Sequence, residues 1–255
     1  MTLSELDKFF RDFLKPEEYL SDPSKNGIQI SNSSPESKQI KKIGFAVDAC
    51  VESAKKAAES GCDLLFVHHG LFWGDCKTIT GSFYSRISEF IKNDLALYAM
   101  HIPLDANIPY GNNFALAQRI GLQNIERFGK WRGMSIGLKG KLSSPCSAQE
   151  LSQKVLNPDE KPLAILPFGK ALIETVGIIS GGAAEDVEDA ILEGLDAYIT
   201  GEPSHEKFHV AKEGKINMIC GGHYQTETTG INLVRQKVEK ELKIPCEFID
   251  IPTML

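Results

Sequence analysis

Near-continuous apolar runs alternate along the chain with apolar residues at helical spacing. The runs at 42–47, 63–69, 95–100, 175–180, 197–200 and 216–220 predict strands. The helical patterns lie at 51–60, 84–92, 113–120, 184–193, 204–213 and over about 16 residues from Thr226. Apolar strands that alternate with helices predict an α/β protein with mixed, mostly parallel sheets covered by helices.

Two further segments complete the predicted layout. Near the start, Leu6, Phe10 and Leu14 recur at helical spacing, and either Thr2 or Ser4 can cap that helix. The stretch 127–170 does not show this alternation of strands and helices as clearly and contains several glycines and prolines. Its one clear helix start is the capping box formed by Ser147 and Glu150.

An internal repeat organises the chain. Residues 43–69 align with residues 176–202 without a gap, so that Gly44 meets Gly177 and Asp63 meets Asp196. The few identities also fit the general needs of βαβ units, but the matching order of two successive units favours duplication. We therefore expect two related halves, the first formed by residues 1–126 plus 221–255 and the second by residues 127–220. Ligands of such sheets bind beyond the carboxyl ends of the strands, here in the crevice between the halves.

Side chains able to bind metal stand at these strand ends. The set comprises four of the six histidines and two carboxylates: His68, His69, His101, Asp105, His223 and Glu227. Any one histidine could be a hydrogen-bonded loop residue, but four at equivalent places favour a metal site. Imidazole and carboxylate donors without thiolates suit zinc, iron, manganese or nickel. Because five or six ligands exceed what one tetrahedral ion uses, we expect two divalent metal ions per chain.

The sequence around these residues resembles the NIF-three-like dinuclear metal-centre family, whose bacterial members are often labelled GTP cyclohydrolase I type 2 homologues. The resembling blocks are HHGLFW at 68–73, LYAMHIPLDA at 97–106, ITGEPSH at 199–205 and GGHYQTE at 221–227. They follow the family order and, with NGIQI at 26–30, extend over nearly the whole chain. Ile102 departs from the Thr or Asn that is common in the family, which affects pocket shape more than metal binding.

The resemblance implies roles for the individual residues. It implies metal ligation by five residues, with the last as the bridge between the ions: His68, His69, Asp105, His223 and Glu227. His101 matches a family histidine at the site, and Glu202 and His205 match positions beside the cleft. The repeat aligns Glu202 with His69, which suggests that Glu202 lines the site. Glu202 could instead cap the helix that Pro203 begins. We expect His101 and Glu202 to be the catalytic proton carriers, with His101 a weak ligand or a base beside the ligands.

Composition narrows the functional classes. The formal net charge of −6 argues against a dedicated nucleic-acid binder, and no apolar run reaches the length of a membrane span. Six cysteines without a C-x-x-C pair suggest reduced thiols and a cytoplasmic location. We expect a metal-dependent hydrolase that uses a metal-bridging hydroxide on a small molecule, which the resemblance suggests is a nucleotide. The alternative is a non-catalytic metal-binding protein, acting as a metallochaperone or an interaction platform. The resemblance also implies a homo-oligomer, with a hexamer as the expected size.

Overall fold

The computed structural model describes residues 1–255, which divide by their contacts into two units. Unit 1 comprises Met1–Leu104 and Ile231–Ile251, and unit 2 comprises Asp105–Gly230 and Pro252–Leu255. These boundaries differ from the expected ones at residues 126 and 221.

The difference arises from two segments that pack within unit 2. Leu122 pairs with Leu142 in the second sheet, so the chain has already left unit 1 before residue 126. Gly230 donates its N–H to the side chain of Asn112, which keeps the first turns of the last helix with unit 2. The sequence pattern marks strands and helices but not these tertiary contacts.

Unit 1 contains a five-stranded sheet in the order β1-β4-β3-β2-β11. Its strands are β1 (Gly27–Ile30), β2 (Ile43–Asp48), β3 (Leu64–His69), β4 (Ala96–Ala99) and β11 (Cys246–Phe248). Only β1 is antiparallel to its neighbour, at one edge. The helical segments are α1 (Leu3–Leu14), η1 (Pro16–Glu18), α2 (Val51–Glu59) and α3 (Gly81–Lys92).

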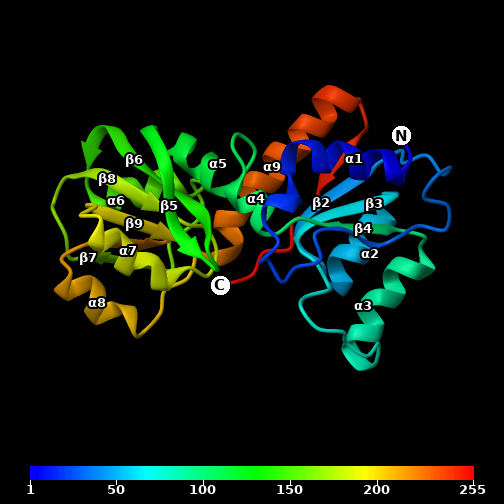
Figure 1. Ribbon diagram of the computed structural model, residues 1–255, viewed down its shortest axis with the longest axis horizontal. Helices are drawn as coiled ribbons and strands as arrows, with labels where there is room; N and C mark the ends of the chain where they lie inside the picture. Colours follow the sequence, from blue (N-terminus) through cyan, green and yellow to red (C-terminus); the bar gives the residue numbers. More distant parts are fainter. The chain divides into compact units, whose positions relative to one another are not determined.

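The two faces of this sheet bury different side chains. Phe66 and Tyr98 stack at 5.6 Å on the face where Phe10 of α1 packs. Leu65 and Val67 point to the other face, into a core shared with buried residues of α2 and α3. This alternation gives three layers, with α1 on one side of the sheet and α2 and α3 on the other (Figure 1).

Unit 2 contains a six-stranded sheet in the order β5-β6-β8-β9-β10-β7. Its strands are β5 (Leu122–Trp131), β6 (Met134–Cys146), β7 (Ala164–Pro167), β8 (Ile173–Ile178), β9 (Ala197–Thr200) and β10 (Asn217–Cys220). The helical segments within it are α5 (Asn112–Arg119), α6 (Ala148–Val155), η2 (Ala184–Asp186), α7 (Val187–Leu192) and α8 (Lys207–Glu213). Helices α5 and α6 share its main core, to which Leu116, Leu151 and Ile199 contribute.

Two helices run through the unit boundaries. They are α4 (Ile102–Ala106) and α9 (His223–Leu242). The second begins three residues before Thr226, where the sequence pattern had placed its start. The first residue of α9 is His223. The sequence pattern does not mark this start, because the glycines at 221 and 222 before it give no apolar signal. None of the helices combines the length and apolar character that a bilayer crossing requires.

The predicted α/β class is confirmed, and the central strands of the two units share one arrangement. Gly44 of β2 pairs with Leu65 of β3, and Gly177 of β8 pairs with Tyr198 of β9 in the same register. Each unit then adds a third parallel strand, β4 or β10, and an antiparallel edge strand, β1 or β7. The matched register supports the two related halves inferred from the repeat.

Other local predictions had mixed outcomes. The capping residue of α1 is Thr2, whose capping box with Glu5 settles the choice between Thr2 and Ser4. The capping box of Ser147 and Glu150 opens α6 as expected. The stretch 127–170, however, also contains most of the long β5–β6 hairpin, which the sequence pattern missed.

Candidate metal centre

Three histidines gather at the carboxyl ends of β3 and β4 in unit 1. One ring nitrogen from each of His68, His69 and His101 lies within 4.8 Å of the others. The ring centroids of His68 and His69 are 4.5 Å apart, and those of His68 and His101 are 5.1 Å apart. His68 is fully buried, whereas the other two are half-buried. The strand ends therefore bring together three of the predicted site histidines.

The Nδ1 atom of each histidine has a fixed partner. His68 donates from Nδ1 to the carbonyl of Met100 at 2.9 Å. His69 donates to Asp48 at 2.9 Å, and His101 donates to Asp22 at 2.9 Å. A metal would consequently be bound through Nε2, and the carboxylate or carbonyl behind each ring would orient it.

Asp22 holds several groups at once. Its side chain is completely buried and accepts hydrogen bonds from the N–H groups of Ser24 and Ile102 and from the amide of Asn26. Burial acts to raise the pKa of Asp22, but the hydrogen bond from His101 and these further donors bring the pKa below its usual range. Asp22 therefore ties the loop before β1 to the segment that carries His101.

Strand β3 ends with the two adjacent histidines, and Gly70 follows them. The ladder with β2 continues to His69, which pairs with Asp48, so no turn separates the two adjacent histidines. The need for glycine is steric instead, since an added Cβ would lie 2.3 Å from the side-chain oxygen of Gln29. That oxygen accepts hydrogen bonds from Leu71 and Phe72.

A second set of donors lies in unit 2. Carboxylate oxygens of Asp105 and Glu227 come within 4.8 Å of each other. His223 Nε2 lies 3.2 Å from Glu227 Oε1, one helical turn away on α9. The side chain of Glu227 is only 3% exposed, so its charge is largely removed from water. Buried carboxylates of this kind require a compensating positive partner.

His223 sits between two carboxylates. Its Nδ1 lies 2.5 Å from Glu202, on the opposite side of the ring from Glu227. Burial would lower the pKa of His223, but its contacts with Glu227 and then Glu202 raise it to about 9. The pocket around this ring thus favours positive charge, which either a proton or a metal ion can supply.

Asp105 is positioned by neutral donors. Asn112 donates its amide N–H to Asp105 Oδ1 at 2.9 Å, and the hydroxyl of Ser180 donates to the same oxygen at 3.1 Å. Asn113 in turn accepts the backbone N–H of Ser180. Both bonds fall on the same oxygen of Asp105, which fixes the orientation of its carboxylate.

These residues fit a divalent metal by their chemistry. Imidazoles whose second nitrogen is held by a carboxylate or carbonyl, together with buried carboxylates, are the usual ligands of such ions. The structure gathers all six predicted strand-end residues into these two sets, one in each unit. His205 is exposed and belongs to neither.

The sequence reasoning missed the residues that support the ligands. Asp48 and Asn112 gave no periodic signal, because each acts through one side-chain contact. Asp22 could have been found, since an Asp followed by Pro and Ser is typical of a turn in which the carboxylate accepts an N–H two residues ahead. The structure adds Glu202 to this group through its contact with His223.

The fold and the donor sets together define a class of protein: a duplicated α/β protein with histidine and carboxylate groups able to bind metal. The family model of Duf34/NIF3 (NGG1p interacting factor 3) matches residues 1–254, and the chain belongs to this family.

Named relatives agree with this assignment. The chain is 41% identical to "GTP cyclohydrolase 1 type 2 homolog" of Treponema pallidum, over 99% of each chain. It is 39% identical to the Archaeoglobus fulgidus protein of the same name, over 100% of each chain. Among solved structures, "protein ybgI, unknown function" is similar with a TM-score of 0.90 and 30% identity, over 100% of each chain.

Proposed function

We propose that this protein is a metal-dependent hydrolase with two divalent ions per chain. The histidine set is His68, His69 and His101, and the carboxylate set is Asp105 and Glu227 with His223. We propose that both sets serve the same two ions. The proposed ligands are His68, His69, Asp105, His223 and Glu227. Zinc, iron, manganese and nickel all suit imidazole and carboxylate donors.

The observation that carries the proposal is the orientation of the imidazoles. Each of the three proposed ligand histidines, His68, His69 and His223, has Nδ1 against an oxygen atom, which presents Nε2 as the ligand atom. This arrangement is typical of metal-binding histidines. The carboxylates of Asp105 and Glu227 supply the negative charge that neutral imidazoles lack, so the two sets complement each other.

The bound ions would supply Lewis acidity and a water activated at neutral pH, which hydrolysis requires. The chain itself would move the protons. We assign this task first to His101, because Asp22 holds its Nδ1 and can stabilise a proton taken up at Nε2. Glu202 is the second proposed proton carrier, although its bond to His223 equally suits it to holding that ligand.

The substrate class comes from the relatives. Their printed name, "GTP cyclohydrolase 1 type 2 homolog", suggests a nucleotide for this chain too. A panel of nucleotides and phosphoesters, assayed with the metal-loaded protein, tests this. Full metal loading without turnover on any member would favour the alternative of a non-catalytic metal-binding protein.

Metal analysis of the purified protein tests the centre. We expect about two ions per chain, and loss of one or both in Glu227→Ala, because this carboxylate is the proposed bridge. The matched control is His205→Ala, which removes an exposed imidazole and should leave the stoichiometry unchanged. One ion per chain that Glu227→Ala leaves in place would refute the dinuclear centre.

Assembly and location remain predictions. We propose a homo-oligomer in the cytoplasm, with a hexamer as the expected size. Light scattering at micromolar concentration should then give a mass well above the 28.1 kDa of one chain. A mass near that of one chain would contradict the proposal.

A further inference from the structure

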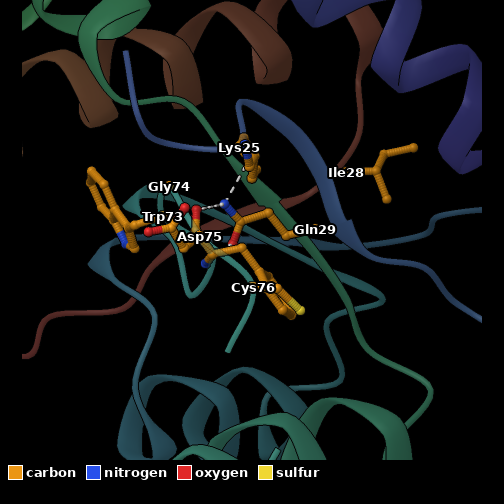
Figure 2. A pocket seen from close by; sticks show the side chains of 8 residues that line it. Lys25, Ile28, Gln29, Trp73, Gly74, Asp75 and Cys76 are labelled. Carbon is orange, nitrogen blue, oxygen red and sulfur yellow. Dashed lines mark hydrogen bonds between the residues drawn. The ribbon is translucent and has the colours of Figure 1, made fainter. Parts of the chain in front are cut away.

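A pocket lies beside the histidine set, between the loop before β1 and the loop after β3. It has a volume of about 390 Å³, and its lining includes Lys25, Ile28, Gln29, Phe72, Trp73 and Asp75. Figure 2 shows these side chains, with Trp73 on one side of Gln29 and Ile28 on the other. The volume is within the range of small-molecule sites.

Hydrogen bonds between the two loops hold the pocket walls in place. The N–H of Lys25 donates to the carbonyl of Phe72, and the N–H of Gly74 donates to the carbonyl of Pro23. Gln29 bridges both loops, since its oxygen accepts two N–H groups after Gly70 while its amide donates to the carbonyls of Lys25 and Phe72 (Figure 2). Because hydrogen bonds already hold the loops that form this pocket, ligand binding costs little conformational entropy.

Trp73 connects this pocket to the proposed metal centre. Its ring packs edge-on against His101, with centroids 4.8 Å apart, and lies 6.1 Å from the ring of His69. Its indole N–H donates to the carbonyl of Gly70, which fixes the ring. A ligand that rests against Trp73 is therefore a direct neighbour of the histidines.

The lining indicates what kind of ligand fits. Phe72, Trp73 and Ile28 offer apolar surface to a flat ring. Gln29 and the Trp73 N–H are already engaged in hydrogen bonds, so charge recognition falls to two other groups. The ammonium group of Lys25 and the carboxylate of Asp75 make no ion pair with the rest of the chain. A carboxylate accepts from two adjacent N–H groups on a ring edge, and an ammonium group binds an anion.

We propose that this pocket is a substrate subsite for a planar nitrogen heterocycle that has adjacent N–H donors on one edge and carries an anionic group. Trp73 contacts the ring, Asp75 accepts from its N–H edge, and Lys25 binds the anion. The inference rests on the proposed function, because it places this ring beside the residues that would perform the hydrolysis.

Binding of guanosine monophosphate to the purified, metal-loaded protein tests the subsite. The chain has two tryptophans, so Trp131→Phe leaves Trp73 as the sole indole and makes fluorescence a reporter of this pocket. We expect saturable quenching by guanosine monophosphate. Adenosine monophosphate, which lacks the paired N–H edge, and ribose 5-phosphate, which lacks the ring, should bind at least about tenfold more weakly.

Substitutions then assign the contacts by calorimetry. Trp73→Leu should weaken binding of guanosine monophosphate by about tenfold or more. Lys25→Gln, an exposed change that leaves the fold intact, should weaken it about two- to fivefold and leave the affinity for uncharged guanosine unchanged. Equal affinity of the wild-type protein and both variants would overturn the proposal.

The metal content of the same samples separates this proposal from the proposed function. Two ions per chain without any binding of the nucleotide would overturn the subsite and leave the metal centre standing. Specific binding that both substitutions weaken, in protein without metal, would support the subsite and contradict the hydrolase.

Discussion

Unit 1 and unit 2 use the same central strands in the same register but place different chemistry at the strand ends. Unit 1 ends β3 with His68 and His69, and the aligned positions in unit 2 are Gly201 and Glu202. In unit 1 the carboxylate of Asp48, at the end of the neighbouring strand β2, supports His69 of β3. In unit 2 the roles are exchanged, because Glu202 supports a histidine that comes from a helix.

One glycine makes this exchange possible. Gly181 is aligned with Asp48, and a Cβ added to it would lie 2.3 Å from Glu227 Oε1 and 3.2 Å from His223 Nε2. A side chain like that of Asp48 would therefore occupy the space that these two residues of α9 use. The comparison teaches that a duplicated scaffold can keep its strand pairing while the residue at one position decides which element supplies the ligands.

The largest effect is expected from Gly181→Ala. The added methyl group would displace Glu227 and His223, so we expect loss of metal. The backbone of Gly181 has φ +70°, which disfavours any side chain, so we also expect the free energy of unfolding to fall by about 1–2 kcal/mol. Metal analysis and denaturant unfolding measure the two. Gly194→Ala is the matched control, because φ is +69 there and no atom lies within 4 Å of the added Cβ. It should show similar strain with full metal content, and equal metal loss in both variants would contradict this account.

His101→Ala should come next in size. Removing a group that moves a proton lowers turnover by about 10²–10⁴-fold, while both ions should stay bound. Paired kinetics and metal analysis check this once a substrate is found. Loss of metal would make His101 a tight ligand of the histidine set, and retained activity with retained metal would remove it from the mechanism.

The supporting carboxylates allow a direct comparison of the two units. We expect Asp48→Asn and Glu202→Gln each to weaken metal binding by about 10–100-fold, because each variant removes the charge behind one imidazole. Competition with a chelator measures both affinities. Unchanged affinity in Glu202→Gln, together with lower turnover, would identify Glu202 as a proton carrier instead of a support.

The smallest expected effect is on stability, and it comes from a difference between two further aligned positions, Ser53 in unit 1 and Asp186 in unit 2. Ser53 is buried and neutral, and its hydroxyl donates to the carbonyl of Asp48. Burial, together with the nearby charges of Asp189 and Glu185, raises the pKa of Asp186 to about 6. The folded protein therefore holds this proton more tightly than the unfolded chain, so the free energy of unfolding falls as pH rises from about 4 to about 6.

Asp186→Asn should remove that pH dependence. We expect the variant to be more stable than the wild type by roughly 1 kcal/mol at pH 7–8, after allowance for partial exposure, and equally stable near pH 4. Urea unfolding across this pH range measures the difference. If the free energies of unfolding of the variant and the wild type differ by the same amount at every pH, the charge of the carboxylate is not the cause of the difference.

The sequence predicted the parts of the fold whose signal is local. The central strands are buried on both faces, so their apolar runs are unmistakable, and the capping box at Ser147 involves neighbours in the chain. Strands β5 and β6 expose many polar side chains and contain irregular register, which removes both the apolar run and the strict alternation.

The candidate site divides in the same way. Histidines at strand ends are visible in the sequence, because strand prediction locates the ends. The turn at Asp22 is visible in the sequence, but its contact with His101 is not, because only the folded chain brings these two residues together. The contact of Asn112 with Asp105 likewise follows no periodic spacing. The supporting layer of the site therefore had to come from the structure.

Anomalous diffraction from crystals of the metal-loaded protein, collected at the absorption edge of the bound metal, tests the central claim most directly. The account predicts two peaks per chain that share Glu227, with Nε2 atoms of His68, His69 and His223 and an oxygen of Asp105 as the other protein ligands. A single peak, or peaks that lack either the histidine set or the carboxylate set, would contradict it.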